Sequence, residues 1–148
     1  MPPATSPGLA PGYEFGYDQI TSGVNITGTS AGSPTTIITC AAHWFDGQPV
    51  MCEFFTVGAI ADATTGDFLG VALWEGSTDL ATIVFQRRAQ TVTTDYQAIS
   101  ANYRFTPTAG MHTYLIRAYV SANNNASISA GAAGVNTAAP AYVRFVKI

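Results

Sequence analysis

Hydrophobic and polar residues alternate along most of the chain with the two-residue period of β-strands. Tyr13, Phe15 and Tyr17, for example, alternate with acidic or small residues. Clusters of Gly, Pro, Asn and Asp, which favour turns, separate one such run from the next. The pattern predicts about ten strands: 13–18, 24–27, 37–40, 50–55, 68–75, 81–88, 97–105, 112–120, 126–132 and 141–148.

No segment shows a sustained apolar stripe with the 3.6-residue period of a helix. Residues 59–65 could form one helical turn, but the segment is too short and too β-branched to persist alone. Breaks every 8–12 residues are typical of a β-sandwich or barrel. The chain is therefore predicted to be all-β and antiparallel, with a single domain over residues 13–148.

The last predicted strand, 141–148, carries apolar side chains on both faces. Val143 and Phe145 lie on one side, whereas Tyr142 and Val146 lie on the other. This pattern predicts a central strand. Because an antiparallel sheet in a monomer normally presents one face to water, the second apolar face indicates contact between subunits.

Residues 1–12 differ from the rest of the chain because they are rich in proline. Pro2, Pro3, Pro7 and Pro11 fix the backbone and remove amide donors, so this segment cannot join a central strand. It is predicted to be an extended arm that is either a disordered tail or lies on another surface.

Composition excludes several classes of partner. Hydrophobic residues make up 47% of the chain, too many for a disordered protein. No apolar run reaches the roughly 20 residues of a membrane helix, so no membrane partner is predicted. With only 6 Lys and Arg and a net charge of −3, the chain is also poorly suited to bind the phosphate backbone of nucleic acid.

The charges are unevenly distributed along the sequence. Residues 1–86 contain eight of the nine acids and no base, whereas residues 87–148 contain all six bases. Interleaving of the two halves in a β-fold would disperse these charges over one surface, which is the favoured interpretation. The alternative is that acidic and basic rims of neighbouring subunits meet head to tail.

Two cysteines, Cys40 and Cys52, are predicted on neighbouring strands. The turn between them favours an offset, and thus two buried free thiols, although a disulfide stays open as an alternative. The first residues have neither the basic nor the apolar region of a signal peptide. The glycosylation sequons at Asn25 and Asn125 therefore carry no weight.

The sequence contains few groupings that could support catalysis or metal binding. Residues 28–32 match G-x-S-x-G, but Pro34 and a β-branched run follow where a nucleophile elbow needs a helix. His43 and His112 have no second ligand at a metal-binding spacing. No catalytic residue, metal or cofactor is predicted.

Two other groupings have ordinary structural explanations. Asp62 and Asp67 flank a small-residue loop but supply too few oxygens for calcium. Arg87 and Arg88 are adjacent on a strand, so they face opposite sides and form no basic patch. The aromatic residues between the other arginines are predicted to pack in the core and in subunit interfaces and not to bind single-stranded nucleic acid.

The order of several aromatic strand ends resembles a known family. The segments are 12–21 (GYEFGYDQIT), 50–55 (VMCEFF), 110–114 (GMHTY) and 140–145 (PAYVRF). Together they resemble small β-domains in minor structural proteins of tailed bacteriophages, especially phages of actinobacteria. The resemblance covers nearly the whole chain after residue 12. It implies a jelly roll of tumour-necrosis-factor or C1q-like shape that assembles as a trimer on the virion.

We therefore expect a non-enzymatic, homotrimeric capsid decoration protein on the capsid exterior, bound to the major capsid protein through the prolines of its arm. The residues expected at the subunit interface are Tyr114, Tyr119, Tyr142 and Phe145.

Two alternatives remain open. The first is the knob of a tail or head fibre that binds a host receptor or glycan, with Trp44 and Trp74 exposed for sugar stacking. The second is an enzyme that depends on His43 or His112. The absence of a shaft repeat or coiled coil favours decoration over the knob.

Overall fold

The computed structural model describes residues 9–61, 67–87, 96–121 and 126–148. These residues form strands and connections only, without a helix. The strands are β1 (Glu14–Ile20), β2 (Val24–Asn25), β3 (Thr35–Thr39), β4 (His43–Asp46), β5 (Val50–Ile60), β6 (Phe68–Glu75), β7 (Thr78–Arg87), β8 (Gln97–Phe105), β9 (Ala109–His112), β10 (Tyr114–Val120), β11 (Ser127–Ser129) and β12 (Ala141–Lys147).

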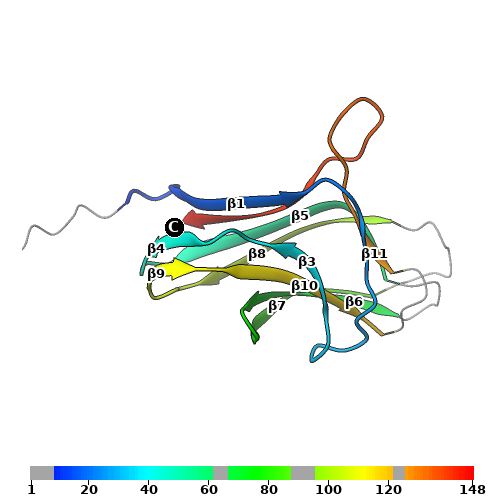
Figure 1. Ribbon diagram of the computed structural model, residues 1–148, viewed down its shortest axis with the longest axis horizontal. Coiled ribbons are helices and arrows are strands. Elements are labelled where there is room, and N and C mark those ends of the chain that lie inside the picture. The colour runs from blue at the N-terminus through cyan, green and yellow to red at the C-terminus, as the bar shows by residue number, and fades with distance from the viewer. Residues whose placement is uncertain (1–8, 62–66, 88–95, 122–125) are drawn as a thin grey trace, which may run out of the picture.

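The strands form a sandwich of two antiparallel sheets (Figure 1). Sheet 1 has the order β1-β12-β5-β8. In addition, β11 pairs with the last residues of β5, and β2 pairs with β11. Sheet 2 has the order β3-β10-β6-β7. If the eight main strands are numbered along the chain, the two orders are 1-8-3-6 and 2-7-4-5, which is the connectivity of a jelly roll. The predicted all-β sandwich is thus confirmed.

The core fills the space between the sheets with large apolar side chains. Phe45 lies at the centre of an aromatic cluster, with ring centroids 5.0 Å from Phe15, 5.5 Å from Tyr114 and 5.7 Å from Phe145. Inward-facing residues alternate with half-exposed ones along β5 and β12, as expected for strands that have one face in the core. These strands are the middle of sheet 1, so the predicted central position of the last strand is also confirmed.

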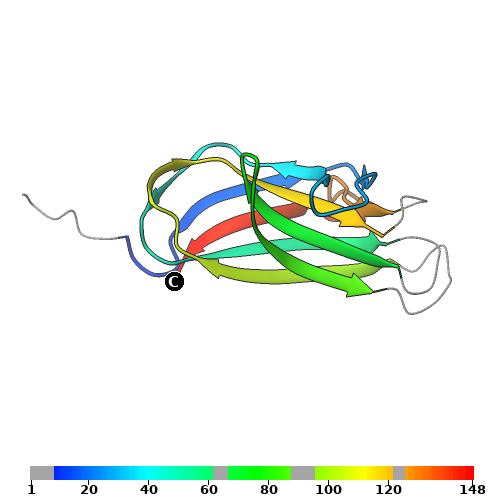
Figure 2. The ribbon, with the colours of Figure 1, turned by 90° about the horizontal axis from the view of Figure 1, so that it is seen from below.

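The short strands β4 and β9 pair with each other as a separate two-stranded ribbon. The ribbon lies at the end of the sandwich from which the N-terminal segment leaves and at which the C-terminus ends (Figure 1). We call this the arm end. The main strands run along the long axis of the molecule, from the arm end to the opposite end (Figure 2).

One ordered loop projects from the sandwich between β11 and β12 (Figure 1). Backbone bonds from Gly131 to Ala139 and from Ala133 to Ala138 join its two sides. Val135 near its tip is 92% exposed, so it contributes almost nothing to the fold of one copy.

Most strand positions agree with the predicted ones, and the exceptions are local. The ribbon strands β4 and β9 were not predicted as a pair, because His43 and the residues before His112 read as turn neighbours. The possible helical turn over 59–65 is a strand as far as Ile60, and its residues 62–66 lie outside the described chain.

Candidate functional site

A row of aromatic rings lies on the outer face of sheet 1. Tyr17 of β1 stacks on Tyr142 of β12 with centroids 5.4 Å apart, and Tyr142 contacts Phe55 of β5 at 5.5 Å. We call these three residues the aromatic face. Tyr17 is 44% exposed, and its hydroxyl donates to the side chain of Gln19 at 2.9 Å. One copy therefore presents a nearly flat aromatic surface on three neighbouring strands.

An ion pair lies beside these rings. Arg144 Nε donates to Glu53 Oε2 at 2.5 Å, and this hydrogen bond raises the pKa of Arg144. Arg104 is exposed on β8 of the same sheet and has no acidic partner within the described chain. The outer face of sheet 1 thus carries the pair of Arg144 and Glu53, the unpaired Arg104, and on β1 the exposed Glu14, whose charge acts on Tyr17 and Arg144.

The second uncovered surface is the side of the sandwich where the edge strands β7 and β8 meet. A groove of about 360 Å³ is lined there by residues 83–86 and 98–101; we call it the edge groove. None of the ten residues of β7 is buried, although half of them are apolar, and Phe85 is 64% exposed. A long apolar edge strand is an aggregation hazard unless another surface covers it.

The third uncovered surface is the arm end. Trp44 and Met111 lie opposite each other in the β4–β9 ribbon, and both are more than half exposed. Tyr13 and Ile148 are also exposed and flank Lys147, whose backbone bonds to Gly12 and Tyr13. Four large apolar side chains of the arm end are therefore exposed.

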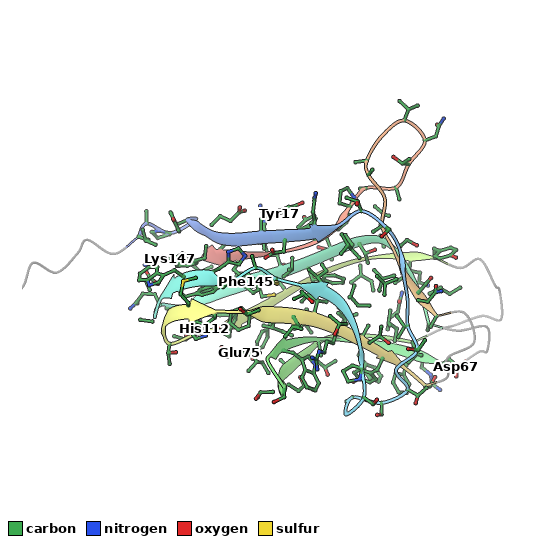
Figure 3. All side chains as sticks on the ribbon, in the orientation of Figure 1. Tyr17, Asp67, Glu75, His112, Phe145 and Lys147 are labelled. Atoms are coloured by element: carbon green, nitrogen blue, oxygen red, sulfur yellow. The ribbon has the colours of Figure 1, made fainter. Side chains whose placement is uncertain are left out.

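Each histidine ties the ribbon to a different sheet. His43 Nε2 lies 2.6 Å from Asp18 Oδ2 on β1. His112 Nδ1 lies 2.5 Å from Glu75 Oε1 on β6, while its Nε2 lies 2.9 Å from the carbonyl oxygen of Thr108 (Figure 3). His112 therefore joins the ribbon to β6 through Glu75 and to its own loop through Thr108.

A further ion pair is nearly buried at the same end. Lys147 Nζ donates to Asp46 Oδ2 at 2.5 Å, and this bond is the main cause of the lowered pKa of Asp46. The pairs Asp46–Lys147, Glu53–Arg144 and Glu75–His112 each join an acid of residues 1–86 to a base of residues 87–148. The two halves interleave, so these charges are matched within one copy, whereas Arg104 and Arg117 have no acidic partner among the described residues.

The four residues predicted at a subunit interface have different surroundings. Tyr114 and Phe145 are 1% and 0% exposed, so the core of a single copy already covers them. Tyr119 is buried against Gly70 on the outer side of sheet 2. Only Tyr142 has substantial surface, and its neighbours Tyr17 and Phe55, which the sequence analysis does not select, complete the aromatic face.

Other predicted site residues are placed only in part. Pro11 is described and exposed. The residues outside the described chain are Pro2, Pro3, Pro7, Asp62, Arg88 and Asn125. Of the two tryptophans proposed for sugar stacking, Trp44 is 52% exposed, but Trp74 is only 7% exposed on β6. The expectation of an exposed Trp74 is therefore wrong, because Trp74 lies within a strand of sheet 2 instead of a loop.

Both cysteines are free and buried. Burial raises the pKa of Cys52 to about 12, and it raises the pKa of Cys40 further. A thiol that stays protonated is a poor nucleophile and a poor metal ligand. The favoured interpretation, in which these residues fill the core, therefore agrees with the structure.

The remaining sequence motifs belong to ordinary structure. The G-x-S-x-G segment leads into strand β3, not into a helix. Across the described ranges, no three His, Cys, Asp or Glu side chains gather as a metal site. The same ranges contain no helix long and apolar enough to cross a membrane.

No protein-family model matches the chain, and no curated protein matches it either.

Proposed function

We propose that the chain is a non-enzymatic structural protein of a bacteriophage virion. It forms a homotrimeric capsid decoration protein on the capsid exterior, anchored to the major capsid protein through residues 1–12. The single observation that carries this proposal is that one copy leaves two separate surfaces with large apolar side chains uncovered, the aromatic face and the edge groove with its strand β7. The sequence resemblance to phage structural domains supports the proposed location on a virion.

The two surfaces favour packing of the edge of one copy on the face of the next. The edge groove and the aromatic face are different surfaces, so each copy can use one of them for each of two neighbours. A ring results when this contact repeats around a rotation axis, and a trimer is the smallest ring in which the two neighbours of each copy are different molecules. This reasoning supports a trimer.

The unmatched charges favour the same arrangement. Arg104 is exposed on sheet 1, and Asp79 is exposed on β7, and neither has an ion-pair partner within the described part of one copy. Opposite charges on the two contacting surfaces would set the register of the subunits more than they would add affinity.

The oligomeric state tests the proposal. Sedimentation equilibrium should give three times the monomer mass, and Phe85→Asp should give monomers because it places a charge at the apolar edge. Val135→Asp is the matched control: it introduces the same charge at a more exposed site outside both surfaces, and it should leave the trimer intact. A wild-type protein that stays monomeric at micromolar concentration would overturn the proposal.

The exposed residues of the arm end support anchoring there. Trp44, Met111, Tyr13 and Ile148 are exposed large hydrophobic side chains of the arm end. A shell protein that binds the arm would also cover these side chains, which removes apolar surface from water.

A fibre knob that binds a host glycan is the second candidate. Exposed Trp44 favours it, because an indole ring on the surface can stack on a sugar. Glycan binding that is lost in Trp44→Ala, together with no affinity for capsid shells, would support the knob over the decoration protein.

A further inference from the structure

We propose that the outer face of sheet 2 carries a binding site for an oxyanion, formed by Arg117 of β10 and Trp74 of β6, and that its ligand is a saccharide with a carboxylate group. The guanidinium carbon of Arg117 lies 4.7 Å from the centroid of the Trp74 ring. A guanidinium stacked on an indole keeps its planar fork of donors in one orientation. Such a fork is suited to bind a carboxylate through two hydrogen bonds.

The charge of Arg117 is not used within the described fold. Arg144 and Lys147 each bind a carboxylate of the same copy, whereas Arg117 forms no ion pair with any described residue. Within the described part of the chain, the side chain of Arg117 stacks on the Trp74 ring and binds no carboxylate. A half-buried cation that is held in place without a counter-ion creates a positive potential that attracts an anion.

Two buried donors at this position also lack acceptors. Arg117 Nε and Trp74 Nε1 are both shielded from solvent and have no hydrogen-bond partner. Both groups can only donate, and a buried donor without an acceptor is unfavourable. Trp74 is more than nine-tenths buried, so its N–H group has no compensating contact with bulk water. A carboxylate reached by rotation of Arg117 would supply acceptors to both donors.

The surroundings are suited to a sugar. The strand register places Thr36 of β3 opposite Arg117, and Thr82 of β7 opposite Ala72, on the same outer face. The hydroxyl groups of Thr82 and Tyr119 lie 3.4 Å apart. Hydroxyl groups around a fixed guanidinium are the polar groups expected to orient a saccharide.

One acidic residue restricts the charge of the ligand. Asp79 lies opposite Trp74 in the β6–β7 register and is exposed. Its negative charge disfavours a dianion such as sulfate more than a monoanion such as a uronic acid. The site therefore favours a single carboxylate.

The site is independent of the proposed function. Arg117 and Trp74 belong to neither the aromatic face nor the edge groove, and Asp79 alone is named in both proposals, so failure of this site would leave the oligomeric state unchanged. Conversely, a monomeric protein could still bind the saccharide.

The test is a ¹H–¹⁵N NMR titration of the full chain, which has two indole N–H signals that Trp44→Phe assigns. Sodium glucuronate should shift the Trp74 signal saturably, uncharged glucose should not, and the Trp44 signal is the internal control. If neither glucuronate nor sulfate moves the Trp74 signal more than the Trp44 signal, the site is overturned. A response to sulfate alone would overturn the saccharide assignment.

Variants separate the site from a general charge effect. Arg117→Gln should weaken glucuronate binding at least tenfold, and Arg117→Lys should weaken it less, because the charge stays while the fork is lost. Arg104→Gln removes an exposed arginine on the other sheet that has no ion pair with a described residue, and it should leave glucuronate binding unchanged. Equal weakening by Arg117→Gln and Arg104→Gln would overturn the site, with circular dichroism verifying that each variant is folded.

Discussion

At the scale of single residues, the most consequential interaction is the nearly buried pair of Lys147 and Asp46. Removal of one member leaves the other charge without a partner in a poorly solvated place. Such a loss costs about 3 kcal/mol when the pair is buried. The half-exposed pair of Arg144 and Glu53 has the same chemistry in a solvated position, where about 0.5 kcal/mol is expected.

We predict that Lys147→Met lowers the free energy of unfolding at pH 7 by about 3 kcal/mol, and that the difference from wild type shrinks in acid. The pKa of Asp46 is lowered in the folded state, so its contribution is complete above the unfolded pKa and disappears as the pH falls through the folded pKa. Urea unfolding at pH 7 and pH 3, at one chain concentration, measures both effects. Arg144→Gln is the control, and a loss as large as that of Lys147→Met would contradict the argument.

At the scale of elements, the β4–β9 ribbon is held by side chains more than by strand pairing. It has four residues in each strand and joins neither sheet. Its histidines reach across to Asp18 and Glu75 on the two sheets, and Phe45 inserts into the core. The stability of the ribbon is therefore predicted to depend on close packing between its side chains and the two sheets.

Gly16 provides a test of that packing. A Cβ atom at this position would lie 2.3 Å from the ring of His43, so Gly16→Ala must displace the histidine from Asp18. We predict a loss of about 2 kcal/mol in the free energy of unfolding, typical of an overpacked site. In a His43→Ala background the same substitution should cost much less, because the clashing ring is gone.

The double-mutant cycle in urea measures this coupling. Gly32→Ala is the control, since nothing lies closer than 4.0 Å to a Cβ there, and it should be nearly neutral. If Gly16→Ala costs the same with and without His43, the ribbon is not held in the way described.

The strands of the sheets could be predicted from sequence because alternation and turn residues act locally. The side that each residue faces could not always be predicted. Tyr13, Phe15 and Tyr17 alternate as if they shared one face, yet Phe15 is in the core and Tyr17 is on the aromatic face. The pairing with β12 shifts between Glu14 and Gly16, and such a bulge reverses the facing of the residues beyond it.

Long-range contacts limited the prediction of the candidate sites for the same reason. Tyr114 and Phe145 are aromatic residues on strands, a pattern that suits a core and an interface equally. Only the packing of the two sheets determines that they are covered by Phe45 and Phe105 within one copy. The stacking of Arg117 on Trp74 likewise joins residues 43 positions apart, so no local pattern indicates it.

At the scale of the whole molecule, the arm and the sandwich are predicted to have separable roles. Leu9 packs against the core, and Gly12 N donates to the carbonyl oxygen of Lys147 at 2.7 Å. The part of the arm that can be removed without disturbing the sandwich therefore ends at residue 8. Deletion of residues 2–8 removes three of the four prolines and keeps both of these contacts.

We predict that this deletion leaves the solution mass and the melting temperature unchanged but abolishes binding to capsid shells purified without the protein, as measured by cosedimentation. Replacement of Pro2, Pro3 and Pro7 by alanine keeps the length and should weaken binding about tenfold, because each proline lowers the ordering cost by about 0.5 kcal/mol. Shell binding that survives the deletion would contradict anchoring by the arm. Binding that instead falls with Trp44→Ala alone would place the anchor on the exposed ribbon at the arm end.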